Sequence, residues 1–254
     1  MSIAACAALV QRGDPDRFAA VMAAPVDLRA RLLPLYAFNL EVARAPWVTK
    51  EPMIAEMRLQ WWRDVVAEAA PRQHEVAGPL FALITTAGLP VSVLDQLIAA
   101  RRWDIYSAAF ADAAAFATYL EDSAAGLMWL AAKACGAPDH AEPAVRDFGW
   151  AAGLAGYLRA VPELAARGRV PLIDGRPDAV RALAQTGLAR LRRAQAGSSQ
   201  VGRAAGAALL AGWQTEALLR QVARDPLVVI EARMGISEFA RRGSLAWQAI
   251  SGRW

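Results

Sequence analysis

The chain has 254 residues, of which 56% are hydrophobic and 20% charged, so it can bury a large core and is not disordered as a whole. Its net charge is +4, but the basic residues form no run and no groove-reading motif, which argues against a nucleic-acid partner. The two cysteines and two histidines lack zinc-ligand spacing, and lone cysteines are typical of a reducing compartment.

Helix propensity is high along nearly the whole chain, because alanine is abundant and β-branched residues are sparse. Proline, glycine and Asp-Pro pairs indicate where helices end and begin. The expected helices cover residues 15–24, 26–45, 52–69, 76–87, 91–110, 113–134, 142–160, 180–196 and 203–223, with a separate short segment at 162–170 and a last helix beginning at 226. No strand alternation, repeat or linker interrupts them. The sequence therefore predicts one all-α domain over residues 1–254, with roughly nine to eleven helices.

The N-terminus lacks the basic region of a signal peptide, and no apolar run is long enough to cross a bilayer. The expected location is cytoplasmic, with at most peripheral contact with the inner face of a membrane.

The stretch from Leu33 to Asp64 carries the most specific pattern, and Pro46 and Pro52 divide it into a helical hairpin. Its end, RLQWWRD, allows two interpretations of Trp61 and Trp62. They form either a ligand platform beside arginines or part of the core with charged neighbours over their edges, and the core interpretation is preferred. Helical spacing places Met53, Met57, Trp61 and Val65 on one stripe and Leu59, Trp62 and Val66 on the next.

Other polar residues favour structural roles. Glu121 and Asp122 are adjacent, so they point in different directions on a helix and make a poor metal pair. Asp104 follows Arg101 by three residues, which favours a salt bridge. Both histidines, His74 and His140, lie in expected loops and should be solvated. Two interpretations exist for Arg190, Arg192, Arg193 and Arg203. They form either a solvated helix face or a surface for anionic lipid or an acidic partner, and the solvated face is preferred.

Four blocks of the sequence resemble the squalene/phytoene synthase family. They are LPLYAFNLEVAR, RLQWWRD, TYLEDSAAGLMWLAAKACG and AAGLAGYLRAVPELAARGRVPL. The blocks stand in the family's order, and the resemblance runs from about Asp14 to Trp247. It implies the all-α isoprenoid synthase fold, a helical bundle around a central cavity. Active members join two allylic diphosphates head to head, and two aspartate motifs facing each other across the cavity hold the Mg²⁺ ions that neutralise the departing diphosphate.

This sequence departs from the family pattern where those aspartates would stand. The resemblance places the first motif's aspartates on Ala43 and Trp47 and the second's on Ala160 and Leu164. The polar residues that usually precede the second motif are replaced by Gly153 and Gly156, whereas Arg159, Glu163 and Arg169 are retained. The resemblance thus implies no standard metal site. It places the chain near a subgroup that lacks the motifs and includes a phytoene-synthase-like assembly factor of mitochondrial respiratory complex I.

The resemblance leaves three hypotheses open. The preferred one is a scaffold, assembly-type or lipid-binding protein without the standard activity, whose cavity holds an apolar or isoprenoid-like ligand or packs on a protein partner. The second is an active prenyltransferase with a displaced Mg²⁺ site built from Glu41, Asp64, Asp104 or Glu163, and only this one needs a cofactor. The third is an interaction module whose cavity is filled by its own side chains.

No residue is assigned a catalytic role. The cavity is expected between the faces Tyr36–Glu41, Met57–Trp61 and Leu154–Arg159. The residues that we expect to line it or to contact a ligand are Tyr36, Asn39, Glu41, Met57, Arg58, Trp61, Asp64, Asp104, Arg159, Glu163 and Arg169.

Overall fold

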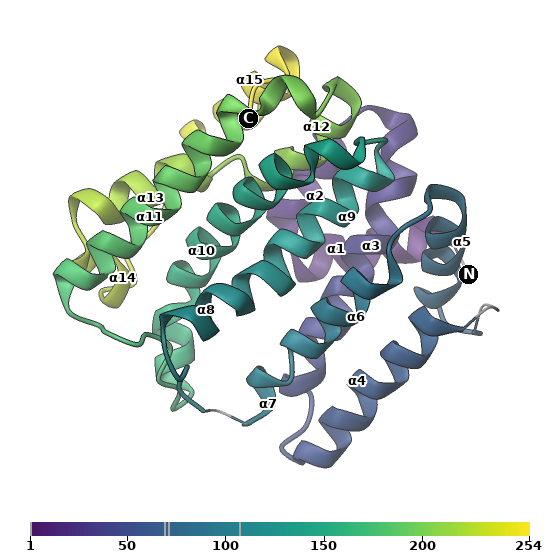
Figure 1. The fold of residues 1–254 in the computed structure, drawn as a ribbon, viewed down its shortest axis with the longest axis horizontal. Helices are drawn as coiled ribbons and strands as arrows, with labels where there is room; N and C mark the ends of the chain where they lie inside the picture. The colour runs from purple at the N-terminus through teal and green to yellow at the C-terminus, as the bar shows by residue number, and fades with distance from the viewer. Residues whose placement is uncertain (1, 69, 71, 107) are drawn as a thin grey trace.

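The computed structural model describes residues 2–68, 70, 72–106 and 108–254, and every regular element within those ranges is helical (Figure 1). The predicted all-α fold is therefore confirmed. The α-helices are α1 Ile3–Gly13, α2 Pro15–Ala23, α3 Val26–Arg44, α4 Pro52–Ala67, α5 Ala77–Ala87, α6 Val91–Ala100, α7 Trp103–Tyr106, α8 Ala113–Leu120, α9 Gly126–Ala134, α10 Glu142–Ala166, α11 Pro177–Ala196, α12 Arg203–Leu209, α13 Thr215–Arg224, α14 Leu227–Ile230 and α15 Glu238–Ser251.

The longest helix, α10, runs through the middle of the bundle (Figure 1). It packs against α11 and α13 on one side and against α9 and the segment before it on the other. The second half of the expected helix 113–134 is α9, which contacts α3, α6, α10 and α12 and is buried almost all round. Its burial follows from the sequence, because only Lys133 is charged over these nine residues.

A π-helical turn, Glu121–Ala125, joins α8 to α9 and packs closely against α10. A Cβ atom at Gly149 would lie 2.6 Å from Cβ of Met128, and one at Gly153 would lie 2.3 Å from Cβ of Ala124. These two glycines therefore allow α10 to approach the π-helical turn and α9 closely. Gly156 has no such role, because a Cβ there would meet nothing within 4 Å.

The segment before Asp14 forms a helix, α1, that the sequence interpretation left unassigned. Ser2 caps it by accepting a hydrogen bond from the backbone N–H of Ala5, and Cys6 and Val10 are fully buried. The spacing of Ile3, Cys6 and Val10 would have indicated one helical face.

Three expected boundaries were wrong. The helix expected to end at Ala160 continues through Pro162 to Ala166, because a proline there removes only the hydrogen bond to the carbonyl of Leu158 and the buried Val161 keeps the turn packed. The helix expected over 91–110 ends at Ala100, and the one expected over 203–223 breaks around Gly212, where α10 approaches so closely that a Cβ would meet the Phe148 ring at 2.6 Å.

Two other expected ends differ less. α4 ends at Ala67, and the expected end of this helix at Ala69 and Pro71 lies outside the described residues. The last part of the chain, expected to begin a helix at 226, forms the short α14 followed by α15.

The C-terminal helix α15 is attached to the bundle through polar contacts and through Leu245 and Ala249, which pack against Ala20, Leu210 and Trp213. Trp213 donates its indole N–H to the carbonyl of Arg241, and Gln248 donates its amide to the carbonyl of Trp213. On the outward side of the helix, Phe239, Trp247 and Ile250 are 90%, 63% and 76% exposed. None of the helices is long and apolar enough to cross a membrane, as far as the described residues go.

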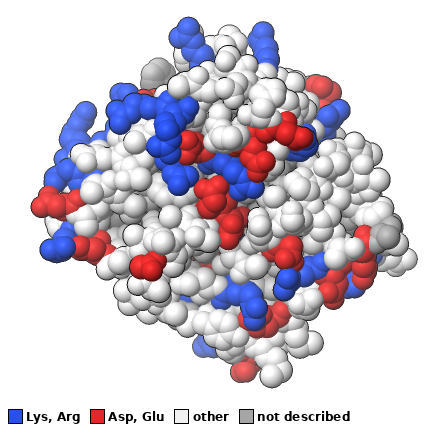
Figure 2. Space-filling model, in the orientation of Figure 1, with Lys and Arg blue, Asp and Glu red and all other residues white. Residues whose placement is uncertain are grey.

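Charged side chains are interspersed on the face that carries α10 and α11, as Figure 2 shows. Arg190 is ion-paired with Glu121 at 3.2 Å, and Arg193 is ion-paired with Asp147 at 2.9 Å. The preferred interpretation of this arginine-rich helix as an ordinary charged face agrees with these pairs.

Candidate functional site

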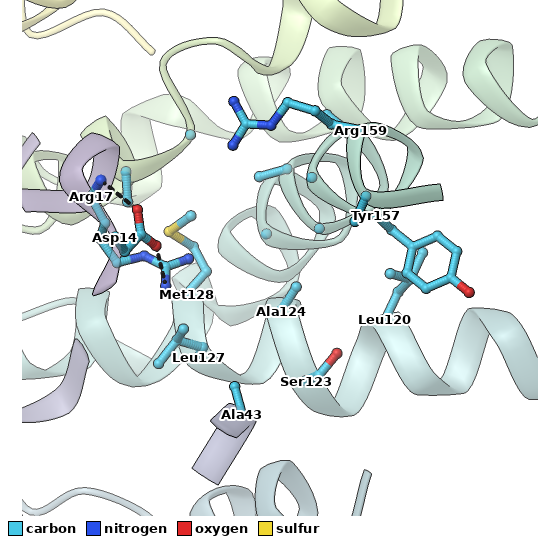
Figure 3. A pocket seen from close by; sticks show the side chains of 18 of the residues that line it. Asp14, Arg17, Ala43, Leu120, Ser123, Ala124, Leu127, Met128, Tyr157 and Arg159 are labelled. Carbon is cyan, nitrogen blue, oxygen red and sulfur yellow. Dashed lines mark hydrogen bonds and ion pairs between the residues drawn. The ribbon is translucent and has the colours of Figure 1, made fainter. Parts of the chain in front are cut away.

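A cavity of about 370 Å³ lies between α3, the run from α8 to α9, and α10 (Figure 3). Ala43 of α3 and Arg159 of α10 lie on opposite sides of it in Figure 3. The apolar part of its wall includes Leu120, Ala124, Leu127, Met128, Ala152, Ala155, Leu164 and Leu218. Its polar lining is concentrated in Asp14, Asp16, Arg17, Arg101, Asp104, Tyr119, Ser123, Arg159 and Gln214.

The positions where the family pattern would place metal ligands face this cavity. Ala43 and Trp47 line it from the end of α3 and the turn that follows, and Ala160 and Leu164 line it from α10. The cavity therefore persists between the two motif helices, but methyl, indole and isobutyl groups stand where carboxylates would be needed. Among the described residues, no group of three or more His, Cys, Asp or Glu side chains is arranged to hold a metal ion. The residues present do not fit a Mg²⁺ cluster.

The three carboxylates that do line the cavity are each engaged with arginines. Asp14 caps α2 by accepting from the backbone N–H of Arg17 at 2.9 Å and pairs with its guanidinium at 3.1 Å (Figure 3). Asp16 pairs with Arg159 at 3.3 Å and with Arg241 of α15. Arginine charges thus balance these carboxylates, which are spread over the cavity wall and form no metal-binding group of three among the described residues.

The third carboxylate, Asp104, is 5% exposed and belongs to a buried polar cluster. Arg101 pairs with it at 3.5 Å, so the salt bridge expected from the sequence is confirmed. The hydroxyl of Tyr119 accepts a hydrogen bond from Arg101 at 3.0 Å and donates to Asp104 at 3.3 Å. Arg169, also buried, donates to the backbone carbonyls of Trp103 and Asp104. The cluster fixes α7 against α8 and α10 and closes one side of the cavity.

Burial dominates the protonation equilibria of this cluster. It raises the pKa of Asp104, and the charges of Arg101 and Arg169 oppose that shift. It also raises the pKa of Tyr119 to about 12, because the phenolate would be desolvated beside Asp104, although Arg101 opposes this. The Tyr119 hydroxyl therefore stays protonated at neutral pH and keeps its hydrogen bond to Asp104.

The first expected cavity face is only partly correct. Tyr36 lines the cavity, is 2% exposed, donates to the carbonyl of Ala208 at 3.4 Å and lies under the guanidinium of Arg17. Asn39 is buried but does not line the cavity, and its Oδ1 has no hydrogen-bond partner among the described residues. Glu41 is half-buried and also lies outside the lining.

The second expected face, Met57–Trp61, does not line the cavity. Met57 is 65% exposed and Arg58 is exposed, because α4 packs against α6 through its other side. The stripe expected to contain Met53 and Met57 was therefore wrong for both methionines, since Met53 is 75% exposed. The neighbouring stripe of Leu59, Trp62 and Val66 is buried.

The tryptophan pair belongs to the core, as the preferred interpretation held. Trp62 is 3% exposed and packs edge-on against Phe38, with ring centroids 5.3 Å apart. Trp61 is half-buried and contacts His74, with ring centroids 5.2 Å apart. His74 is consequently not a freely solvated loop histidine, whereas His140 is exposed as expected.

The carboxylates proposed for a displaced Mg²⁺ site do not converge. Asp64 accepts a hydrogen bond from Gln60, lies 4.0 Å from Arg72 and lines neither cavity. Glu163 is exposed and paired with Arg167, and Asp104 is held by Arg101. The hypothesis of a displaced metal site is contradicted by these positions.

A second, open cavity of about 670 Å³ adjoins the first and shares Trp47, Ala160 and Leu164 with it. The rest of its lining consists of Arg12, Gly13, Leu40, Arg44, Glu163 and Arg167. Trp47 lies at the junction, with the guanidinium groups of Arg167 and Arg169 at 4.8 Å and 4.9 Å from its ring centroid.

Several cavity residues were missed by the sequence interpretation, namely Asp16, Arg17, Tyr119, Ser123 and Gln214. Arg17 shares helical spacing with Phe18, Val21 and Met22, and an arginine among such apolar residues could have indicated a polar cavity. Asp16 and Gln214 meet only because elements far apart in the chain come together, so no local pattern indicates them.

Comparison with known proteins gives a consistent result. A family model described as squalene/phytoene synthase matches residues 10–172. The similar proteins include the NADH dehydrogenase (ubiquinone) complex I assembly factor 6 of Bos taurus, which is 28% identical over 170 residues, covering 65% of this chain and 51% of that protein. The homologous factor of Drosophila melanogaster is 31% identical over 178 residues, covering 66% and 53%. The chain thus spans about half the length of these relatives.

Solved structures agree on the fold. A dehydrosqualene synthase in complex with a ligand has a TM-score of 0.68 at 12% identity, covering 98% of this chain and 95% of that one. The squalene synthase HpnC from Alicyclobacillus acidocaldarius has a TM-score of 0.63 at 20% identity, covering 98% and 94%. At these identities the likeness shows a shared fold and says nothing of a shared reaction.

Proposed function

This chain belongs to the squalene/phytoene synthase family, and from that premise we propose that it is an assembly-type protein rather than a Mg²⁺-dependent prenyltransferase. The resemblance found in the four sequence blocks and the isoprenoid synthase fold are both confirmed. What this particular member does has to be argued from its cavity.

One observation carries the proposal. Ala43, Trp47, Ala160 and Leu164 face the cavity at the positions where the family pattern has aspartates. Head-to-head condensation requires the departure of a highly charged diphosphate, which carboxylate-bound Mg²⁺ ions neutralise. Without those carboxylates the cavity can enclose an apolar molecule but lacks the groups that would drive ionisation.

The proposed role in assembly is supported by the relatives, which are named as assembly factors of complex I. We propose that the partner is a protein of an NADH dehydrogenase complex of this type, and that the retained cavity holds an apolar or isoprenoid-like molecule. A cavity of about 370 Å³ lies within the range of small-ligand sites.

The absence of prenyl transfer can be tested directly. Purified protein would be incubated with farnesyl or geranylgeranyl diphosphate and Mg²⁺, and released diphosphate would be measured beside an active dehydrosqualene synthase. We expect release at the level of the protein-free control. Robust, protein-dependent release would overturn the proposal.

The assembly role needs a separate experiment. The gene would be deleted in the source organism, and NADH dehydrogenase assembly would be followed on native gels together with the content of squalene- and phytoene-derived lipids. We expect loss of the assembled complex with unchanged lipids, restored by the wild-type gene. Intact complex together with lost lipids would contradict the proposal.

We also propose that the protein works in a reducing compartment and touches a membrane through α15. Cys6 and Cys135 are free and buried, and Phe239, Trp247 and Ile250 are exposed on one helix, as in interfacial helices. Sedimentation with vesicles of anionic and zwitterionic lipid tests the contact. The variant Trp247→Ser should reduce binding several-fold, and equal binding of both proteins would rule out this surface.

A further inference from the structure

We propose that the second cavity is a metal-independent binding site for an anionic amphiphile, whose phosphate or carboxylate head contacts Arg12, Arg44 and Arg167 and whose apolar tail passes Trp47 into the first cavity. This inference rests on the proposed function in one respect, namely that the cavity is retained for binding rather than for chemistry. We call the site the arginine groove, defined by Arg12, Leu40, Arg44, Trp47 and Arg167.

The charge of the groove comes from three helix ends. Arg12 lies in the last turn of α1, Arg44 is the last residue of α3, and Arg167 follows α10 directly. Within the described parts of the chain, Arg12 and Arg44 have no ion-pair partner, and only Arg167 is paired, with Glu163. Two guanidinium groups at the groove are therefore available to an acceptor from solution.

Arginines at helix C-termini also have a plainer role, because they offset the negative end of the helix dipole. That end is equivalent to about half an elementary charge and its effect is confined to the last turn. Each arginine carries a full charge, and Glu163, which also lines this cavity, offsets Arg167. Arg12 and Arg44 still carry more positive charge than the helix ends require. Arg169, whose guanidinium lies 4.9 Å from the centroid of the Trp47 ring, adds a further positive charge near the groove. A net attraction for an anion remains.

The same groove has an apolar side. Leu40, Trp47 and Leu164 line it beside the arginines, and Trp47 is 36% exposed although it is a large aromatic residue. Arg167 stacks on one part of this indole, which orients its guanidinium along the groove. A purely ionic ligand would leave this surface in water, so the groove fits a ligand that has both an acidic head and an apolar tail.

The two cavities adjoin where the tail would pass. Trp47, Ala160 and Leu164 line both cavities, so in this proposal an acyl or isoprenoid chain lies along these three residues and points towards Leu120, Leu127 and Met128. Ala160 is small where the family pattern has an aspartate, which removes a charged group from this path. Trp47, Ala160 and Leu164 stand at motif positions, and they have two effects in this proposal. They cannot bind a metal ion, and they give the tail of the ligand an apolar surface to contact.

The test is a calorimetric titration with dodecyl phosphate below its micellar concentration, in buffer with EDTA. We expect saturable binding at one site that is unchanged when Mg²⁺ replaces EDTA. Dodecanol should bind at least about tenfold more weakly, because it lacks the charge, and inorganic phosphate at least about tenfold more weakly, because it lacks the tail. Equal binding of dodecanol, equal binding of free phosphate, or a requirement for Mg²⁺ would each overturn the proposal.

Arginine variants test whether dodecyl phosphate binds in the arginine groove. The double variant Arg12→Ala/Arg44→Ala should weaken dodecyl phosphate binding by at least about tenfold, since two charge-assisted contacts are lost. Arg58→Ala is the matched control, because Arg58 is an exposed arginine on α4 that lines neither cavity, and it should bind as the wild type does. Both substituted arginines are exposed, and circular dichroism would verify folding. Equal affinities of the double variant and the control would overturn the proposal.

Failure of this proposal and failure of the proposed function can be distinguished. If dodecyl phosphate does not bind, but the protein releases no diphosphate and its deletion impairs complex assembly, only the arginine groove is overturned. Diphosphate release in the prenyl-transfer assay would instead remove the proposed function, whatever dodecyl phosphate does.

Discussion

Arg101 and Asp104 form an ion pair at 3.5 Å in the wall of the cavity, where their side chains are only 17% and 6% exposed. The pair lies at the junction of α6 and α7, which the sequence would have continued as one helix. The turn allows Arg101 to reach Asp104 and Tyr119 while the next residue, Arg102, reaches Glu56 on α4 at 3.0 Å. A pair of charges therefore determines the shape of this part of the bundle.

The first prediction concerns that pair. Asp104→Ala should lower the free energy of unfolding by about 3–5 kcal/mol, because it leaves the Arg101 charge buried without a partner. The double variant Arg101→Met/Asp104→Leu should be more stable than Asp104→Ala, since no charge is left uncompensated. Urea denaturation of Arg101→Met, Asp104→Leu and the double variant measures the coupling, and simple additivity of these two single changes would contradict the interpretation.

The second prediction uses two glycines of α10. Gly153→Ala should destabilise the protein by about 1–3 kcal/mol, because the new methyl group would lie 2.3 Å from Cβ of Ala124. Gly156→Ala is the matched control, as nothing lies within 4 Å of its Cβ position. It should be neutral or more stable by up to about 1 kcal/mol, since alanine is the better helix former. Thermal denaturation of both variants would show the difference, and equal effects would refute the close packing.

The third prediction separates core from ligand site. Trp62→Ala should cost about 3–5 kcal/mol of unfolding free energy, because the ring is buried against Phe38. Trp61→Ala should cost less, since Trp61 is half-buried, and it should leave dodecyl phosphate binding unchanged. Loss of that binding in folded Trp61→Ala protein would restore the ligand-platform interpretation.

The fourth prediction is a dependence on pH. The pKa of Tyr119 is raised to about 12 by burial in the folded protein, whereas an unfolded tyrosine has a pKa near 10. Between these values the unfolded chain releases a proton that the folded chain retains, so stability falls as the pH rises from about 10 towards 12. Tyr119 should account for about 1–2 kcal/mol of that fall, after allowance for its partial exposure.

The variant Tyr119→Phe provides the measurement for this effect. Its stability, determined by urea denaturation at pH 9, 10 and 11, should fall less steeply than that of the wild type. Identical slopes would show that the hydroxyl is not protected in the cluster.

The fold and the apolar residues at the motif positions could be predicted from the sequence. The other residues that line the cavity were predicted less well. Ala43, Trp47, Ala160 and Leu164 were correctly placed together at the cavity, because helical spacing within two recognisable blocks is preserved by the fold. Met57 and Arg58 were misplaced, because periodicity defines the faces of α4 but not which face meets α6. Asp16 and Gln214 could not be predicted, since their hydrogen bond joins residues 198 positions apart.

The contact between Gly153 and Ala124 has a consequence for engineering a metal site into this cavity. Even with aspartates placed at the motif positions, the Cβ atom of any side chain at position 153 would lie 2.3 Å from Cβ of Ala124. A polar residue there therefore requires coordinated substitutions on α10 and on the π-helical turn against which it packs. Aspartates introduced at the motif positions alone are expected to leave this side of the cavity without a polar residue.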